Sequence, residues 1–390
     1  MLLKDKKIAI IGGGPGGLTL AKLLQLQFVN VIVYERDTDK NARVQGAPLD
    51  LHEHSGLAAL RSAGLLDEFK RNFMPGADKT TITNAHAEIV FSDHENKVEE
   101  NFGHEHFRPE IDRGVLRKIL LDSLQPETIV WNSHFLSMEQ QGSGWLLHFK
   151  NKESEYADIV IGADGANSKI RPYVTEIKPL YSGIVMLEGN IYKASENAPQ
   201  MSALLKGGKI MAFGKDKNIL MGQKANGEIG FYASFRAEEN WPEKSKLNFS
   251  DREEILNWFK THYAEWSEIW QELFEQTNLP FIPRPINYMP LNQTWDTVPN
   301  LTILGDSAHL MPPFAGEGVN MAMLDALELS DALLSKNHQS IPEAISFYEI
   351  NMRKRAAQIA QESLENGEKM HDENALNIMT DFFSGAAEKR

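Results

Sequence analysis

The sequence contains no cysteine. A chain without cysteine forms no disulfide, has no thiolate nucleophile and cannot hold an iron–sulfur cluster through thiolates. No apolar run has the length of a membrane span, and the seven residues 1–7 before the first apolar strand leave no room for a signal peptide. The sequence therefore predicts a cytoplasmic protein whose redox chemistry belongs to a bound cofactor.

Positive charge is also scarce. The 390 residues include 40 Lys and Arg against 54 Asp and Glu, which gives a net charge of −14. Such a balance disfavours nucleic acid and anionic membranes as partners. The length favours two domains, and the 42% hydrophobic and 24% charged content is ordinary for a globular protein. We expect a monomer with a small-molecule substrate and no metal site.

A dinucleotide motif opens the chain. An apolar run leads into Gly12, Gly14 and Gly17, which have the G-x-G-x-x-G spacing, and an apolar helical pattern follows. The glycines allow a tight turn, close approach of a pyrophosphate and helix–strand packing, with the pyrophosphate at the helix N-terminus. A second apolar run ends in Glu35, a carboxylate placed to accept hydrogen bonds from a ribose and to repel a 2′-phosphate. At this point both NAD and FAD remain open.

Two further apolar strands end in glycine and a carboxylate, at Asp164 and Asp306. Strand ends in a doubly wound sheet converge on one crevice, so we expect these acids near the dinucleotide. Asp306 would bind the ribityl hydroxyls of a flavin; the alternative is a helix-capping acid. Gly316 and Gly318 would present N–H groups to the flavin ring, where a side chain would block the flat ring, and the following helix dipole would stabilise a reduced, anionic flavin.

The remaining patterns give the expected elements. Alternation over 181–236, with breaks typical of hairpins, predicts a second sheet. The prolines between 280 and 290 predict a stiff connection. A small antiparallel layer is expected at 129–131, 135–139 and 145–149. Helices are expected at 55–69, 113–121, 319–334 and 341–369, and Asp112 is the expected N-cap of the second. A further helix is expected to begin at a capping box at 250–253.

Taken together, three motifs resemble the fingerprints of the single-component flavin monooxygenases, the para-hydroxybenzoate hydroxylase superfamily. They are 12–17 with Glu35-Arg36, then Asp164-Gly165, then Gly305-Asp306 with Pro312-Pro313. The resemblance covers nearly the whole chain. Segments 50–52, 109–121 and 308–316 look most like the tetracycline-inactivating monooxygenases of the TetX type.

The fold implied by this resemblance is α/β, a Rossmann-like FAD-binding domain with an interleaved β-sheet substrate domain and a long C-terminal helix. The implied domains are an FAD-binding domain of 1–72, 101–175 and 286–340, a substrate-binding domain of 73–100 and 176–285, and a C-terminal helix, 341–390, that bridges them.

The resemblance also implies the cofactor contacts. FAD contacts are implied for Glu35, Arg36, Asp50, Arg113 and Asp306, and an NADPH contact is implied for Arg43. Arg113 can reach flavin or phosphate oxygens with two N–H groups at once. Arg36 and Arg43 fit a solvated basic loop as the alternative, and Arg117 is expected to be a salt-bridge residue. Pro313 would line the wall over the ring, Asn320 would bind the pyrimidine edge, and His309 is a base or, preferably, a structural residue.

The substrate contacts follow from the TetX-type resemblance. They are Glu188, Lys209, Met221, Phe231 and Phe314 on the β-sheet wall and the loop facing it. Glu188 and Lys209 have a cross-strand ion pair as the alternative. An acid and a glycine replace the amide and histidine of the TetX pocket, so the substrate is a tetracycline, a related polyketide or another phenolic compound.

The reaction implied is hydroxylation of an enolic or phenolic ring, with NADPH reducing FAD and O₂ supplying the oxygen. No second G-x-G-x-x-G is present, which fits NADPH that docks transiently, and the W-x-W-x-I-P motif of flavin halogenases is absent. Two alternatives remain: a flavoprotein oxidase or dehydrogenase that takes electrons from its substrate, and a protein that binds an aromatic drug without turnover.

Overall fold

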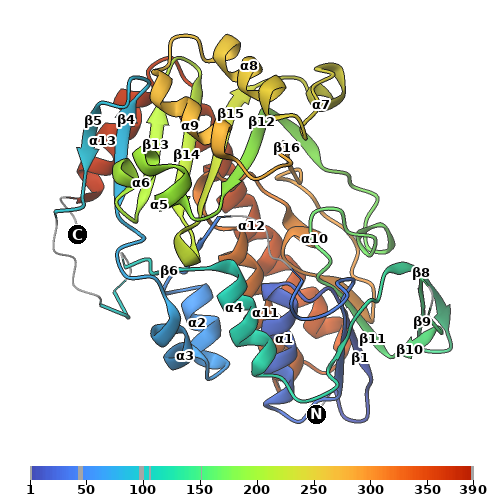
Figure 1. Ribbon diagram of the computed structural model, residues 1–390. Coiled ribbons are helices and arrows are strands. Elements are labelled where there is room, and N and C mark those ends of the chain that lie inside the picture. The colour runs from blue at the N-terminus through green and yellow to red at the C-terminus, as the bar shows by residue number, and fades with distance from the viewer. Residues whose placement is uncertain (1, 43–46, 96–100, 105–106, 151, 388–390) are drawn as a thin grey trace.

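The computed structural model describes residues 2–42, 47–95, 101–104, 107–150 and 152–387, and two large sheets organise it (Figure 1). One is a five-stranded parallel sheet in the order β17-β11-β1-β2-β7. Its strands are β1 (Ile8–Ile11), β2 (Val31–Tyr34), β7 (Ile129–Val130), β11 (Ile159–Gly162) and β17 (Leu301–Ile303). Glu35, Asp164 and Asp306 follow β2, β11 and β17, so all three acids lie at the carboxyl edge of this sheet, as predicted.

Helices cover the five-stranded sheet, which explains why its strands are apolar along their whole length. The helices of this part of the chain are α1 (Pro15–Gln25), α2 (Gly56–Ser62), α3 (Leu66–Asn72), α4 (Arg113–Asp122), α10 (Asp306–His309) and α11 (Gly318–Leu334). Asp112 caps α4 by accepting hydrogen bonds from two backbone N–H groups, as predicted. The single helix expected at 55–69 is wrong: it is divided into α2 and α3 at Gly64, whose φ of +71° ends a helix.

A small antiparallel sheet projects beside β11 (Figure 1). It consists of β8 (Phe135–Gln141), β9 (Gly144–Phe149) and β10 (Glu155–Ala157). The predicted membership of 129–131 is wrong, because β7 pairs in parallel with β2 instead. Two short strands, β3 (Leu49–Asp50) and β6 (Glu110–Ile111), form a separate antiparallel pair.

The second large sheet has seven strands in the order β16-β12-β15-β14-β13-β4-β5. They are β4 (Thr80–Asn84), β5 (Ile89–Ser92), β12 (Leu180–Ile191), β13 (Lys209–Phe213), β14 (Lys217–Gln223), β15 (Ile229–Arg236) and β16 (Ile282–Tyr288). An aromatic core joins one face to the helices of this part of the chain. The helices of this part of the chain are α5 (Ala194–Asn197), α6 (Pro199–Leu205), α7 (Trp241–Lys244), α8 (Arg252–His262) and α9 (Gln271–Gln276).

Two expectations for this region need correction. The proline-rich segment is more than a connection, because it contains β16 at one edge of the sheet. An edge strand pairs on one side only, so Pro283 and Pro285, which lack an N–H, are tolerated there. The cap of α8 is Asp251, which accepts from the Glu254 N–H, and not Ser250.

The C-terminal segment forms two helices, α12 (Ile341–Met370) and α13 (Ala375–Ala387). The first packs against α11, and the second lies against β4, β5 and β13, so the segment contacts both large layers (Figure 1). Short 3₁₀ helices are η1 (Arg171–Tyr173), η2 (Ala225–Gly227), η3 (Glu268–Trp270) and η4 (Pro313–Ala315). In the described ranges no helix is both long and apolar enough to cross a membrane. The exact domain boundaries stay a prediction.

Candidate active site

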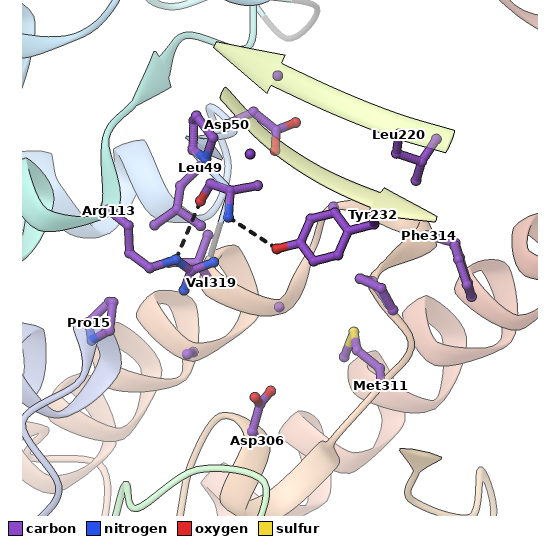
Figure 2. A pocket seen from close by; sticks show the side chains of 18 of the residues that line it. Pro15, Leu49, Asp50, Arg113, Leu220, Tyr232, Asp306, Met311, Phe314 and Val319 are labelled. Atoms are coloured by element: carbon purple, nitrogen blue, oxygen red, sulfur yellow. Dashed lines mark hydrogen bonds between the residues drawn. The ribbon is translucent and has the colours of Figure 1, made fainter. Parts of the chain in front are cut away.

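A cavity of about 690 Å³ lies where the carboxyl edge of the five-stranded sheet meets the seven-stranded sheet (Figure 2). Its wall on the seven-stranded sheet is the face opposite α8 and α9. The polar lining side chains are Asp50, Glu110, Arg113, Lys209, Gln223, Tyr232, Arg284 and Asp306. The larger apolar ones are Met186, Met211, Leu220, Ile286, Met311 and Phe314.

The glycine-rich turn forms one end of this cavity. Gly14 and Gly17 line it at the start of α1, where the first N–H groups of a helix have no intrahelical partner. A Cβ on Gly17 would lie 2.2 Å from the Gly12 carbonyl oxygen, whereas a Cβ on Gly14 meets no described atom within 4 Å. Open space beside helix N–H groups is the geometry in which a phosphate binds.

Glu35 stands at the end of β2, beside this turn. Its buried carboxylate accepts hydrogen bonds from the Gly13 N–H at 2.5 Å and the Asp37 N–H at 2.9 Å. These bonds fix the carboxylate next to the glycines, in the position expected for a ribose-binding acid.

The predicted basic contacts have different placements. Arg36 is exposed and does not line the cavity in the described part of the chain. Arg43 lies outside the described residues. Arg117 forms an ion pair with Asp37 at 2.7 Å, as expected for a salt-bridge residue. Of the predicted arginines, Arg113 is therefore the one that the structure brings to the cavity.

Asp164 supports a turn and does not line the cavity in the described residues. Its carboxylate accepts hydrogen bonds from the Ser168 hydroxyl at 2.6 Å, the Ser307 hydroxyl at 3.0 Å and the Lys169 N–H at 2.7 Å. The acid thus joins the loop after β11 to the loop after β17.

Asp306 lines the cavity, and its side chain points into it (Figure 2). No described residue donates a hydrogen bond to this carboxylate, and burial raises its pKa. Asp325 fixes the turn that carries Asp306. The Gly305 N–H donates a hydrogen bond to Asp325 Oδ2 at 2.8 Å, and His309 Nε2 lies 2.5 Å from the same Oδ2. His309 therefore has a structural partner, and Asp306 is left for a ligand.

The loop between β17 and α11 also lines the cavity, with Pro313 and Gly316, and Gly318 lines it at the start of α11. Gly316 has a φ of +70°, which ends η4 and returns the chain toward α11. A Cβ on Gly318 would meet no described atom within 4 Å, so its backbone is open to a ligand.

Asn320 is placed differently from the prediction. It is fully buried, and its side-chain oxygen accepts hydrogen bonds from the His52 N–H at 2.9 Å and the Gly56 N–H at 3.3 Å. Its side-chain nitrogen donates to the Asp50 carbonyl at 2.9 Å. The amide thus joins α11 to the loop after β3, and it does not line the cavity among the described residues.

Asp50 belongs to a triad that the sequence analysis did not identify. His52 lies between Asp50, at 3.0 Å, and Glu317, at 2.9 Å. Burial alone would lower the pKa of His52, but the two carboxylates raise it. Burial would likewise raise the pKa of Asp50, but the hydrogen bond from His52 and the charge of Lys209 lower it to about 2.

Lys209 lines the cavity and pairs with Glu110 of β6, not with Glu188. Burial raises the pKa of Glu110 to about 6 against the opposing charge of Lys209. Burial would lower the pKa of Lys209, but the charges of Glu110 and Asp50 raise it. The Lys209 ammonium thus interacts electrostatically with the carboxylates of both Glu110 and Asp50. Glu110 was missed because its partner comes from a distant part of the sequence.

Glu188 is buried on the same face of the sheet as Tyr232 and pairs with Arg284 of β16, its Oε2 lying 2.5 Å from the arginine Nε. Arg284 itself lines the cavity. Nearby, Arg113 and Tyr232 both bind the backbone of Ala47 (Figure 2). Arg113 Nε donates a hydrogen bond to the Ala47 carbonyl at 3.4 Å, and the Ala47 N–H donates one to the Tyr232 hydroxyl at 3.2 Å.

Of the three predicted apolar substrate contacts, Phe314 lines the cavity. Met221 lies on a strand that borders the cavity, but its side chain is buried in the core on the other face of the sheet, opposite Phe231. The expectations for Met221 and Phe231 therefore need correction. The Phe231 ring is fully buried on the other face of the sheet, against Phe274 and Phe281. Successive side chains of a strand alternate between faces, so the neighbour Tyr232 reaches the cavity instead. Within the described ranges no cluster of three or more His, Asp or Glu is suited to a metal ion.

Comparison with known proteins places this site in a family. The FAD binding domain family model matches residues 5–207 and 260–363, most of the chain. The monooxygenase asqM of Emericella nidulans is 30% identical over 383 residues, with 84% of each protein covered. The 6-hydroxynicotinate 3-monooxygenase of Pseudomonas fluorescens is 25% identical over 377 residues, with 93% of this chain and 91% of that protein covered. Among solved structures, tetracycline destructase Tet(55) has a TM-score of 0.77 at 18% identity, with 100% of this chain and 97% of that one covered.

The chain belongs to the FAD binding domain family, and it is an FAD-dependent monooxygenase. The superfamily resemblance is therefore confirmed. The likeness to Tet(55) shows the fold alone at this identity, so the TetX-type assignment stays a prediction.

The cavity fits FAD on its own geometry. The open space at Gly14 would take the pyrophosphate, and Glu35 would take a ribose. Asp306, a half-buried acceptor without a donor from the described residues, would bind the ribityl hydroxyls. The backbone at Gly316 and Gly318 would face the ring.

Proposed function

We propose that this monooxygenase takes its electrons from NADPH and hydroxylates a phenolic or enolic ring compound, with a tetracycline or a related polyketide as the first candidate. The observation that carries the proposal is the apolar part of the cavity wall, which includes Met186. Leu220 and Phe314, seen in Figure 2, belong to the same wall. An apolar wall with a few polar groups around it is the type of site that binds a ring and orients its oxygens. The name of one relative, 6-hydroxynicotinate 3-monooxygenase, also describes a hydroxylated ring as substrate.

The reaction is balanced as follows. NADPH, a proton, O₂ and the ring compound give NADP⁺, water and the ring compound with one C–H converted to C–OH. Bound FAD supplies hydride acceptance and O₂ activation. The chain supplies binding, orientation and exclusion of water. The methionines and Phe314 remove water from the wall, while Lys209, Tyr232 and Arg284 are the polar groups placed to orient the ring.

NADPH as donor is supported by the absence of a second dinucleotide motif in the sequence and by the resemblance that implies Arg43 as its contact. Replacing Arg43 with Ala is expected to raise the KM for NADPH about tenfold, the value of one charge-assisted hydrogen bond, and to leave FAD affinity unchanged. Steady-state kinetics with NADPH and NADH measure this, and an unchanged KM would contradict the assignment. The cytoplasmic location and the monomeric state stay predictions.

The experiment that tests the function uses the FAD-loaded protein with NADPH and a panel of tetracyclines, other polyketides, hydroxynicotinates and phenols. We expect substrate-stimulated NADPH oxidation and a product one oxygen heavier by mass spectrometry. Flavin reduction by the ring compound without NADPH would identify an oxidase or dehydrogenase instead. Tight binding of every ligand without turnover would identify a binding protein.

A further inference from the structure

The cavity lining contains sulfur as well as carbon. Met186 of β12, Met211 of β13 and Met311 of the loop between α10 and η4 belong to this lining, and they are called the cavity methionines below. The sequence has 14 methionines and no cysteine, so these thioethers have no thiol that competes with them for an oxidant. A thioether takes up one oxygen atom to become a sulfoxide, which is polar where the methionine was apolar.

The strand register directs two of the cavity methionines toward the cavity. Met211 is directly opposite Leu220, and Leu220 is directly opposite Tyr232. Directly opposite residues project from the same face of a sheet, so Met211 shares the face of Tyr232. Met186 belongs to an apolar cluster against which Tyr232 and Phe314 pack. Both thioethers are therefore on the cavity side of the seven-stranded sheet.

Met311 reaches the cavity from the loop that follows Asp306. Figure 2 shows the Met311 side chain at the cavity with those of Asp306 and Phe314, which come from the same stretch of the chain. Met311 is 7% exposed and Met186 is 3% exposed, whereas Met211 is half-buried. The cavity methionines thus come from both sides of the cavity, and two of them have little surface open to solvent.

Met221 has the opposite orientation on the same sheet. Its strand, β14, lies between β13 and β15 and borders the cavity. Its side chain is opposite Phe231, in the core on the other face. Met221 is 4% exposed, close to the 3% of Met186, so the two thioethers are equally buried and differ in the face that they occupy. An oxidant formed in the cavity would distinguish them, and an oxidant in bulk solvent would not.

The reaction class supplies such an oxidant. An FAD-dependent monooxygenase reduces O₂ in its active site, and when no substrate accepts the oxygen, two electrons and two protons convert O₂ to hydrogen peroxide. Hydrogen peroxide transfers one oxygen atom to a thioether. The O–O bond breaks, an S–O bond forms, the sulfur loses two electrons and the second oxygen leaves as water.

We propose that the cavity methionines are internal oxidation sites, which become sulfoxides when the protein reduces O₂ without hydroxylating a substrate. Each sulfoxide places a polar S–O group in an apolar wall, where a polar group without a hydrogen-bond partner is unfavourable. The modification therefore weakens the apolar wall and limits the lifetime of a protein that works without substrate. Methionine sulfoxide reductases reverse this oxidation. The inference goes beyond the proposed function, because it depends on neither the ring compound nor NADPH.

The test reduces the FAD-loaded protein anaerobically with one equivalent of dithionite, mixes it with ¹⁸O₂ in the dark and repeats the cycle. Catalase removes peroxide from the bulk solution, and an added methionine peptide reports any peroxide that persists there. Peptide mapping by mass spectrometry locates the ¹⁸O. We expect the mean label on the cavity methionines to exceed the label on Met221 at least about tenfold, with the added peptide unlabelled.

The control for bulk oxidation is the FAD-free protein cycled with free riboflavin, which lacks the phosphate and adenosine parts of FAD. With catalase present, its cavity methionines should stay unlabelled. Equal label on Met221 and on the cavity methionines of the FAD-loaded protein would overturn the proposal. Label that appears only when catalase is omitted would also overturn it, because the oxidant would then have come from the bulk solution.

Variants test the consequence for the wall. Leucine conserves the apolar volume of methionine and has no sulfur, so the triple variant Met186→Leu, Met211→Leu and Met311→Leu removes the oxidation sites. Each protein is compared with its own Tm before cycling. The parent should lose about 3 °C or more, and the triple variant should lose less than about 1 °C. The matched control Met221→Leu should lose as much as the parent. Equal losses in the parent and the triple variant would contradict the proposed effect on the wall.

Discussion

At the scale of single residues, Gly14 and Gly17 occur in the same turn but meet different surroundings. A Cβ on Gly14 would touch no described atom, whereas a Cβ on Gly17 would overlap the Gly12 carbonyl at 2.2 Å. The φ of Gly14 is −78°, which any residue adopts. The absence of a side chain at Gly14 therefore matters for the ligand, and at Gly17 it matters for the fold.

Substituting each glycine by alanine separates these two needs. Gly14→Ala should keep the urea midpoint of the FAD-free protein and raise the Kd for FAD at least about tenfold, because the methyl group occupies the approach of the pyrophosphate. Gly17→Ala should lose about 2 kcal/mol or more of stability through overpacking. Fluorescence titration and urea unfolding measure the two effects. Normal FAD affinity in Gly14→Ala would refute the placement of the pyrophosphate.

Asp306 is the half-buried acceptor proposed for the ribityl hydroxyls. Asp306→Ala should raise the Kd for FAD about tenfold or more, the value of a hydrogen bond to a charged group. The matched control is Asp296→Asn, an exposed acid in the loop before β17, which should retain normal affinity. If Asp306→Ala purifies with as much bound flavin as the parent protein, the assignment is wrong.

His52 gives a pH-dependent contribution to stability. Its pKa is raised in the folded protein by Asp50 and Glu317 against the effect of burial. The contribution is therefore fully present below the ordinary histidine pKa of about 6.5 and is lost as the pH rises through the higher folded pKa. Urea unfolding should show His52→Gln about 2 kcal/mol less stable than the parent at about pH 5.5, with a smaller gap at about pH 9. A gap that is constant or grows with pH would contradict the charged triad.

At the scale of elements, α11 fixes the turn that carries Asp306. Asp325 of this helix is fully buried and accepts from the Gly305 N–H, from His309 and from Arg355 of α12. One carboxylate thus joins the end of β17 to two helices. Helix α11 also begins at Gly318, which lines the cavity, so its placement affects both parts of the candidate site.

Asp325→Ala should lower the free energy of unfolding by about 3–5 kcal/mol, since it leaves buried His309 and Arg355 without their partner. Glu328→Gln is the control, because Glu328 also pairs with Arg355 but its side chain is 36% exposed, and it should cost less than about 1 kcal/mol. Thermal or urea unfolding measures both. Equal losses in the two variants would mean that Asp325 does not have the special role given to it.

The strands also show which parts of the site the sequence could predict. Strand β15 alternates between Gly230, Tyr232 and Ser234 on one face and Phe231, Ala233 and Phe235 on the other. The apolar set packs against α8 and α9. The alternation of these large apolar residues along the strand therefore predicted that Phe231 belongs to the core. Pattern alone did not assign β16, because prolines normally interrupt strands and edge position is decided by tertiary pairing.

At the scale of the whole molecule, the cofactor end was predictable because its residues follow strands in local motifs. Glu35 and Asp306 each stand directly after an apolar strand, and parallel strands bring such positions to one edge. The substrate end was not predictable in the same way. Glu110 meets Lys209, and Glu188 meets Arg284, across long separations in the sequence, and only the assembled sheets bring those pairs together.

The central claim is that this protein inserts one atom of O₂ into a ring compound at an FAD site. The most direct measurement is turnover of the FAD-loaded protein with NADPH and the best substrate of the panel under ¹⁸O₂, followed by mass spectrometry of the product. We predict incorporation of one ¹⁸O atom per product molecule, and none when ¹⁸O is supplied as water. Oxygen from water, or an oxidised product with no added oxygen, would contradict the account.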